Sequence, residues 1–179
     1  MKRLLVIVAG LCATPIVLAQ NAPSVQEITK QIIKSAQGYA NAISCPGVVI
    51  TPKEIAALTP YKTLDDRMDA KYAVLWDGDI GCAGGSGTTG TNISIVTVSI
   101  GDSFVVDPHL SSPIIQFESP VRMVSRIVGN TRDTLILEGK EYADKDANCC
   151  PSITVRFTLR VDEKGNWKLV DKKLLPAKK

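Results

Sequence analysis

The chain has 179 residues, of which 5% are aromatic and 22% are charged, and its formal net charge is +3 at pH 7. This length suits one domain with its own core, which aliphatic side chains must largely fill because aromatic residues are few. The near-neutral charge argues against nucleic acid as a partner, since binding to phosphates needs a concentrated basic surface.

The first 19 residues have the composition of a secretory signal peptide. Lys2 and Arg3 form a basic start, residues 4–18 are uncharged and mostly apolar, and a small residue, Ala19, precedes Gln20. The apolar stretch is shorter than the about 20 residues that span a bilayer, which favours cleavage over anchoring. We therefore expect residues 20–179 to form a single periplasmic or secreted domain with no transmembrane segment. With 19 basic and 18 acidic side chains, its net charge is +1.

The cysteines indicate two disulfides. Cys12 lies in the apolar part of the leader, and Leu11 before it does not fit a lipidation site. An even number then remains in an exported chain, which predicts cross-links between Cys45, Cys82, Cys149 and Cys150. Three pairings are possible. Because a bond between the adjacent Cys149 and Cys150 would close a strained ring, we expect each of them to reach Cys45 or Cys82.

The N-terminal part of the domain predicts two helices. Ser24-Val25-Gln26-Glu27 is a capping box, and apolar residues then recur at helical spacing, which predicts a helix over 25–42. Thr51-Pro52-Lys53-Glu54 repeats the start signal, and it predicts a short second helix over 55–58, ended by Pro60.

From residue 71 onward the apolar residues alternate, as in strands. Lys71–Trp76 is a compact apolar strand, and the apolar phase changes between Ile95 and Val96, which predicts a bulge within 93–100. Further strands are expected at 103–106, 114–117, 121–128, 134–141 and 153–161, followed by a turn at 163–166 and a strand at 167–172. The order of elements predicts an α+β domain, with N-terminal helices packed on a mainly antiparallel β-meander sheet. A partly closed β-barrel is the alternative.

Two polar loops are the candidate binding regions, because loops on a rigid scaffold commonly carry function. The first loop, 81–91, follows Asp77 and Asp79 and contains Gly84 and Gly85; the second, 143–152, contains Asp144, Asp146 and Asn148. Glycines in the first loop do not form a phosphate-binding loop, because the required Gly-Lys-Ser/Thr and following helix are missing.

Calcium is an alternative for the acidic residues of these loops. Asp77 and Asp79 could supply oxygen ligands, and the spacing of Asp144, Asp146 and Asn148 matches the opening of a calcium loop. However, the glycine position of such a loop falls on Cys149, and its closing glutamate position falls on Val155. Turn formation by Asp and Asn side chains explains the residues more simply. We expect no metal and no cofactor.

The candidates for catalysis are few. His109 is the only histidine, with Asp107 and the serines 103, 111 and 112 near it in sequence. No Gly-x-Ser-x-Gly elbow occurs, and the members of a triad are normally brought together by the fold rather than by one loop. We therefore expect an exposed loop histidine and no catalytic residue.

The C-terminal part resembles a known family. Asp146-Ala147-Asn148-Cys149-Cys150-Pro151-Ser152, followed by an alternating strand and a hairpin with a tryptophan, is similar to the closing part of the LppP/LprE-type bacterial envelope proteins. Asp77-Gly78-Asp79 leading to Cys82 resembles an earlier element of those proteins. The resemblance implies an exported bacterial protein and supplies no catalytic residues.

These observations favour a non-enzymatic periplasmic or secreted binding domain whose partner is a protein or another envelope component. One alternative is a periplasmic hydrolase that uses Asp77, Asp79 or His109. The other is an inhibitor or immunity protein against a toxic enzyme, for which a small disulfide-bonded scaffold is suited.

Overall fold

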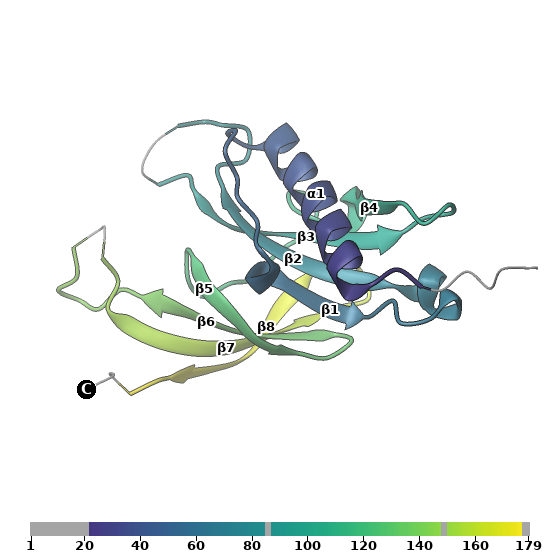
Figure 1. Cartoon of the computed structure of the whole chain (residues 1–179). Helices are drawn as coiled ribbons and strands as arrows, with labels where there is room; N and C mark the ends of the chain where they lie inside the picture. Colours follow the sequence, from purple (N-terminus) through teal and green to yellow (C-terminus); the bar gives the residue numbers. More distant parts are fainter. Residues whose placement is uncertain (1–21, 85–86, 148–149, 177–179) are drawn as a thin grey trace, which may run out of the picture.

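The computed structural model describes residues 22–84, 87–147 and 150–176 (Figure 1). This part of the chain contains one α-helix, α1 (Val25–Ile43), and two four-stranded antiparallel sheets. The first sheet consists, in spatial order, of β1 (Ile55–Thr59), β2 (Lys71–Gly78), β3 (Gly90–Val98) and β4 (Phe104–Asp107). The second consists of β5 (Val124–Asn130), β6 (Thr134–Glu141), β7 (Ile153–Val161) and β8 (Trp167–Leu174). Short 3₁₀ helices are η1 (Pro52–Glu54), η2 (Leu64–Asp69) and η3 (Pro108–Leu110).

The elements form three layers, with α1 on one face of the first sheet and the second sheet on the other (Figure 1). One apolar core lies between the helix and the first sheet, and it includes Ile32, Trp76 and Val96. The other lies between the sheets and includes Leu75 and Phe157. The expected α+β class is thus confirmed in outline, but the expectation of one meander sheet is wrong. Among the described residues the strands separate into two sheets and close no barrel.

The first helix is confirmed. The Ser24 hydroxyl accepts a hydrogen bond from the Glu27 amide at 3.2 Å, which caps the first turn. The buried side chains are Ile28, Ile32, Ala36 and Ala40, one stripe at helical spacing. Ala36 and Ala40 have no exposed surface, because their small side chains let the last turns approach the sheet closely.

The predicted helix over 55–58 is wrong. Its start signal is real, since the Thr51 amide and hydroxyl both donate to the Glu54 carboxylate at 2.7 and 2.6 Å. The turn stops at Glu54, and Ile55–Thr59 becomes β1, paired with β2. Ala56 and Leu58 alternate into the core between the sheets, so pairing and burial outweigh a local helix signal.

The predicted bulge in β3 is also wrong, because the register with β2 runs without a shift from Thr97 to Gly90. Ile93 and Ile95 belong to the core between the sheets, whereas Val96 and Val98 belong to the core under the helix. Both faces of β3 are buried, so the apolar phase changes along the strand without an extra residue.

Most other strands lie where the sequence predicts them, and β6 and β7 have the predicted bounds. The second sheet begins at Val124 rather than at residue 121. The segment 114–117 is not a strand. The Ile114 and Ile115 amides donate to the Ser111 carbonyl in a turn, and Phe117 forms an isolated bridge with Trp167.

Four of the sequence predictions fall on undescribed positions. The signal peptide, Gly85, Asn148 and Cys149 lie outside the described residues. Within the described ranges, no helix is both long enough and apolar enough to cross a bilayer.

Candidate functional site

A disulfide joins the end of the helix to the loop after β2. Cys45 and Cys82 are bonded to each other, 37 residues apart. The expectation that they would bond to Cys149 and Cys150 is therefore wrong, because the antiparallel bridge between Ser44 and Ile80 already brings the two segments together. Cys150 is disulfide-bonded as well.

Asp79 organises the loop that carries this disulfide. Its backbone carbonyl accepts hydrogen bonds from the Cys45 and Cys82 amides at 3.1 and 3.0 Å. Its buried carboxylate accepts from the Gly84 amide at 2.9 Å and from the Thr88 hydroxyl at 2.8 Å. These hydrogen bonds to the Asp79 carboxylate hold the loop together, and this role accounts for the burial of Asp79.

Asp77 belongs to a different set of contacts. Its carboxylate accepts from the Thr91 hydroxyl at 2.5 Å, and the same hydroxyl accepts from the Val124 amide at 2.8 Å. The Thr91 amide in turn donates to the Arg122 carbonyl at 2.9 Å. These bonds connect the first sheet to the start of β5. Asp77 and Asp79 thus have separate partners, and no group of three or more candidate metal ligands occurs in the described ranges.

A polar cleft lies beside Asp77, and we call it the Asp77 cleft. Its volume is about 350 Å³, within the range of about 300–1,000 Å³ typical of ligand sites. Its polar side chains are Lys53, Glu54, Asp77, Thr91, Ser125 and Arg126. Of these, the sequence pointed to Asp77 and, at the end of the predicted loop 81–91, to Thr91. The others come from η1 and β5, which only the tertiary fold brings to the cleft.

Two strand edges border the Asp77 cleft. Pairing between β1 and β2 ends with Ile55 opposite Val74. The following residues of β2 therefore have β3 on one side and, within the described parts of the chain, no paired strand on the other. Leu75 and Asp77 of that segment line the cleft. Opposite them, 124–127 belong to β5, the outer strand of the second sheet. A strand edge offers backbone N–H and C=O groups to an incoming extended chain.

Arg126 is held at the cleft by a buried carboxylate. Glu138 has 7% of its side chain exposed and forms ion pairs of 2.6 Å with both Arg156 and Arg126. Hydrogen bonding from the Arg156 guanidinium, with a smaller contribution from Arg126, holds the pKa of Glu138 below its ordinary value. Arg126 still has 58% of its side chain exposed, so the pair orients its charge without removing it from solvent.

The second predicted binding loop is also built around an aspartate. The Asp146 carboxylate accepts from the Ala143 and Ser152 amides at 2.7 and 2.8 Å, and from the Ser152 hydroxyl at 3.0 Å. The Ala143 amide is the main cause of a lowered pKa at Asp146. Asp146 closes this loop, whereas Asp144 is exposed. This loop and the disulfide loop project from the same end of the molecule (Figure 1).

His109 is exposed, and the serine hydroxyls near it form hydrogen bonds with backbone groups. The Ser111 hydroxyl accepts from the Ile95 amide at 2.8 Å and donates to the Asp107 carbonyl at 2.6 Å. The Ser112 hydroxyl accepts from the Ile93 amide at 3.2 Å. Both hydroxyls thereby accept hydrogen bonds from backbone amides of β3. Among the described residues, neither hydroxyl bonds to the His109 imidazole.

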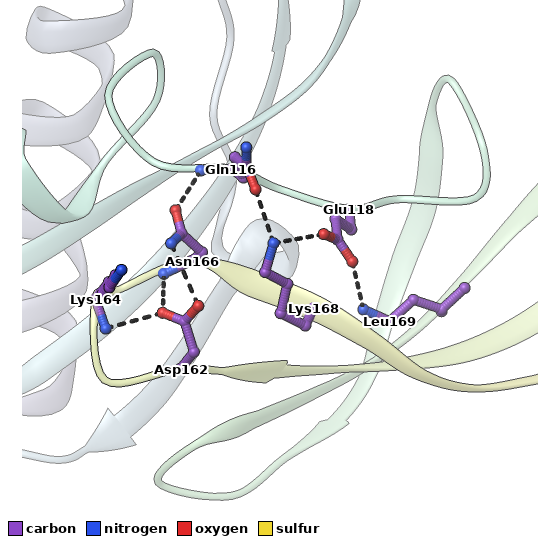
Figure 2. Close-up of polar contacts among 7 residues, drawn as sticks. All are labelled: Gln116, Glu118, Asp162, Lys164, Asn166, Lys168 and Leu169. Carbon is purple, nitrogen blue, oxygen red and sulfur yellow. Dashed lines mark hydrogen bonds and ion pairs between the residues drawn. The ribbon is translucent and has the colours of Figure 1, made fainter.

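A polar network surrounds the turn between β7 and β8 (Figure 2). The Asp162 carboxylate accepts from the Lys164 and Asn166 amides, both at 2.9 Å, and the Asn166 amide is the main cause of its lowered pKa. The Asn166 side chain accepts from the Gln116 amide at 2.9 Å, and Lys168 donates to Gln116 and Glu118 at 2.7 and 2.6 Å. The network fixes the segment 116–118 along the start of β8. Sequence reasoning located the turn but not this segment's role.

The fold defines a three-layer α/β/β domain with a polar cleft between its two sheets. No family model, curated protein or solved structure matches the chain. The function can therefore be inferred only from the geometry of the cleft and from the sequence.

Proposed function

We propose that this chain is a non-enzymatic binding domain of an exported bacterial protein, and that the Asp77 cleft receives an extended segment of a protein partner. The observation that carries the proposal is the pair of strand edges that border the cleft, from β2 and from β5. An extended peptide binds such an edge through its backbone, while alternate side chains enter the neighbouring hollow.

Charges of both signs at the cleft support a peptide rather than an apolar ligand. Lys53 and Arg126 lie on its walls with Asp77. Arg126 is held by Glu138, and Asp77 is held by the Thr91 hydroxyl. Oriented charges favour one direction and one sequence of a bound peptide, and they affect specificity more than affinity.

The hydrolase alternative has less support. General acid–base catalysis needs a carboxyl or imidazole group placed to exchange a proton with the substrate or with water. The Glu54 carboxylate accepts hydrogen bonds from the amide and hydroxyl of Thr51. The Asp77 carboxylate accepts a hydrogen bond from the Thr91 hydroxyl. His109 does not line the cleft. An inhibitor or immunity protein would be one form of the proposed interaction, with an enzyme as the partner.

Location outside the cytoplasm is part of the proposal. Disulfides such as Cys45–Cys82 form and persist mainly in oxidising compartments, and residues 1–19 have the composition of an export signal. The resemblance to the LppP/LprE-type envelope proteins points the same way. We infer a periplasmic or secreted protein whose partner belongs to the cell envelope or its surroundings.

Selection from a displayed library of random peptides tests the site. We expect peptides selected on residues 20–179 to bind at least about tenfold more weakly to Lys53→Glu, which reverses a charge on the cleft wall. Lys34→Glu is the matched control, because Lys34 is exposed on α1 away from the cleft and gives the same net charge. Ser125→Trp should block the cleft, whereas Ser103→Trp, at an exposed position elsewhere, should not.

Replacing single peptide N–H groups by N-methyl groups tests the binding mode. A peptide added to a strand edge uses alternate N–H groups, so methylation at every second position should abolish binding and methylation between them should be tolerated. Uniform tolerance of methylation, or equal binding to the cleft variants and their controls, would refute the proposal.

A further inference from the structure

A groove lies between the first half of α1 and η1, and we call it the α1 groove. Its volume is about 490 Å³, within the range of about 300–1,000 Å³ typical of ligand sites. Its lining residues come from α1, except for the last: Val25, Gln26, Thr29, Lys30, Ile33 and Pro52. None of them lines the Asp77 cleft, so the two hollows are separate.

The helix side of the α1 groove is an apolar ridge beside the buried stripe of α1. Ile28 and Ile32 belong to the stripe that packs on the first sheet. Val25, Thr29 and Ile33 repeat every four residues next to it, so they lie along one side of the helix. Val25 is 76% exposed, and the Thr29 hydroxyl is satisfied within the helix, since it donates to the Val25 carbonyl at 2.7 Å. The apolar face of α1 is therefore wider than the sheet covers.

The α1 groove adjoins the Asp77 cleft, and η1 is the wall between them. Pro52 lines the groove, whereas the next two residues, Lys53 and Glu54, line the cleft. The turn is fixed, because the Thr51 amide and hydroxyl both donate to the Glu54 carboxylate. A 3₁₀ turn of three residues is about 6 Å long, a distance that an extended chain spans with about two residues. One bound segment can therefore reach both hollows.

The segment before η1 places a second exposed apolar side chain on the cleft side of this wall. The chain after α1 runs back along the helix (Figure 1), and the Ile50 amide donates to the Gln37 side chain at 3.3 Å. Val49, next to it, is 75% exposed and lines the Asp77 cleft. Exposed apolar side chains thus flank η1 on both sides, with Val49 at the cleft and Val25 at the groove. Exposed apolar surface gathered in this way is typical of protein interaction sites.

We propose that the α1 groove binds a large aliphatic or aromatic side chain of the same extended segment that occupies the Asp77 cleft. This inference rests on the proposed function, because the strand edges at the cleft bind the backbone of that segment. The apolar side chain follows or precedes the paired residues by about two to four positions, crosses η1 and packs against Val25, Ile33 and Pro52. The partner is thus an extended segment with one apolar anchor residue outside its paired part.

The peptides selected on residues 20–179 test the proposal. We expect those that bind the cleft to carry a large apolar residue at a constant spacing of about two to four positions from the N–H groups that tolerate no methylation. Alanine at this anchor position should weaken binding at least about tenfold, as expected when a large apolar side chain loses its burial.

Val25→Glu should weaken binding of the same peptides at least about tenfold, because it places a charge in the apolar groove. Val25 is the first residue of α1, where a carboxylate suits the helix, so the variant should fold. Ile100→Glu is the matched control. Ile100 is 85% exposed between β3 and β4, lines neither hollow and gives the same net charge, and its substitution should leave binding unchanged.

Combining peptide and protein variants locates the contact. Alanine at the anchor should have less than about a threefold further effect on Val25→Glu, whereas its tenfold effect should persist on Lys53→Glu, which lies across η1. Peptides that depend on Lys53 but have no apolar anchor, or whose anchor acts independently of Val25, would overturn the groove and leave the cleft assignment standing. Peptides that ignore Lys53→Glu would refute the cleft and this inference with it. A wild-type dimer in sedimentation that Val25→Glu dissociates would assign the groove to a second copy and also overturn the proposal.

Discussion

At the scale of single residues, Glu138 has a buried carboxylate on the outer face of the second sheet. It pairs across the strands with Arg126 of β5 and Arg156 of β7. The pKa of Glu138 is lowered, chiefly by the hydrogen bond from Arg156. The folded state therefore binds a proton less readily than the unfolded state, and the pair stabilises the fold above the ordinary glutamate pKa of 4.5.

We expect Glu138→Gln to lower the free energy of unfolding at pH 7 by about 1–2 kcal/mol. The difference from the wild type should shrink below pH 4.5 and vanish as the pH falls through the lowered pKa of the folded state. Urea unfolding at a series of pH values measures this, with Glu163→Gln at an exposed turn as the control. A difference that persists unchanged at low pH would contradict the assignment.

At the scale of elements, the hairpin between β7 and β8 depends on one glycine. Gly165 has a φ of +86°, in the left-handed region, and a Cβ there would approach Leu110 Cδ2 to 2.7 Å. The turn amides are held by Asp162, so the backbone has little freedom to adjust (Figure 2). The left-handed conformation therefore favours glycine, and a Cβ there would also force the end of the Leu110 side chain to shift.

We expect Gly165→Ala to destabilise the domain by about 1–3 kcal/mol. Gly38→Ala is the matched control, because Gly38 lies in α1 and a Cβ there meets nothing within 4 Å. The control should stabilise the domain by about 0.5–1 kcal/mol. Thermal unfolding of both variants checks the prediction, and destabilisation of both to the same extent would refute the position-specific explanation.

Elements also show how local signals and burial compete. The capping box before Val25 predicts a helix correctly, because the following stripe is long enough to cover a sheet. The same signal at Thr51 yields only η1. Pairing with β2 and burial of Leu58 stabilise Ile55–Thr59 as a strand more than a continued helix would. Short apolar segments therefore follow their tertiary neighbours, whereas long periodic segments follow their own pattern.

At the scale of the whole molecule, the disulfide ties the helix layer to the central sheet. Cys45 follows α1, and Cys82 follows β2. The bond closes a loop with a sequence separation of 37 residues, which contains the segment 47–49 of the Asp77 cleft. A cross-link that closes a loop of this length stabilises mainly by restricting the unfolded chain.

We expect the double variant Cys45→Ala/Cys82→Ala to lose about 3–4 kcal/mol of unfolding free energy. It should also bind selected peptides more weakly, because residues 47–49 lose their anchor. Urea unfolding and calorimetry of the same preparation separate the two effects. Substitution isolates this bond better than a reductant does, since Cys150 is also disulfide-bonded. A loss below about 1 kcal/mol would refute the prediction.

The sequence by itself determined the single long helix, the bounds of β6 and β7 and the predominance of antiparallel strands. These features depend on periodicity and on turn residues near in the chain. It also located both acidic loops and predicted that their aspartates form turns, although not which groups Asp79 and Asp146 bind.

Only the tertiary structure decided the division of the strands into two sheets, the pairing of Cys45 with Cys82 and the position of the Asp77 cleft. The physical reason is that both faces of β3 are buried, so apolar and polar residues do not alternate along this strand. The cleft, in turn, is lined by residues that are distant in sequence. Lys53 and Arg126 line the same cleft through packing of the sheets, which no local pattern encodes.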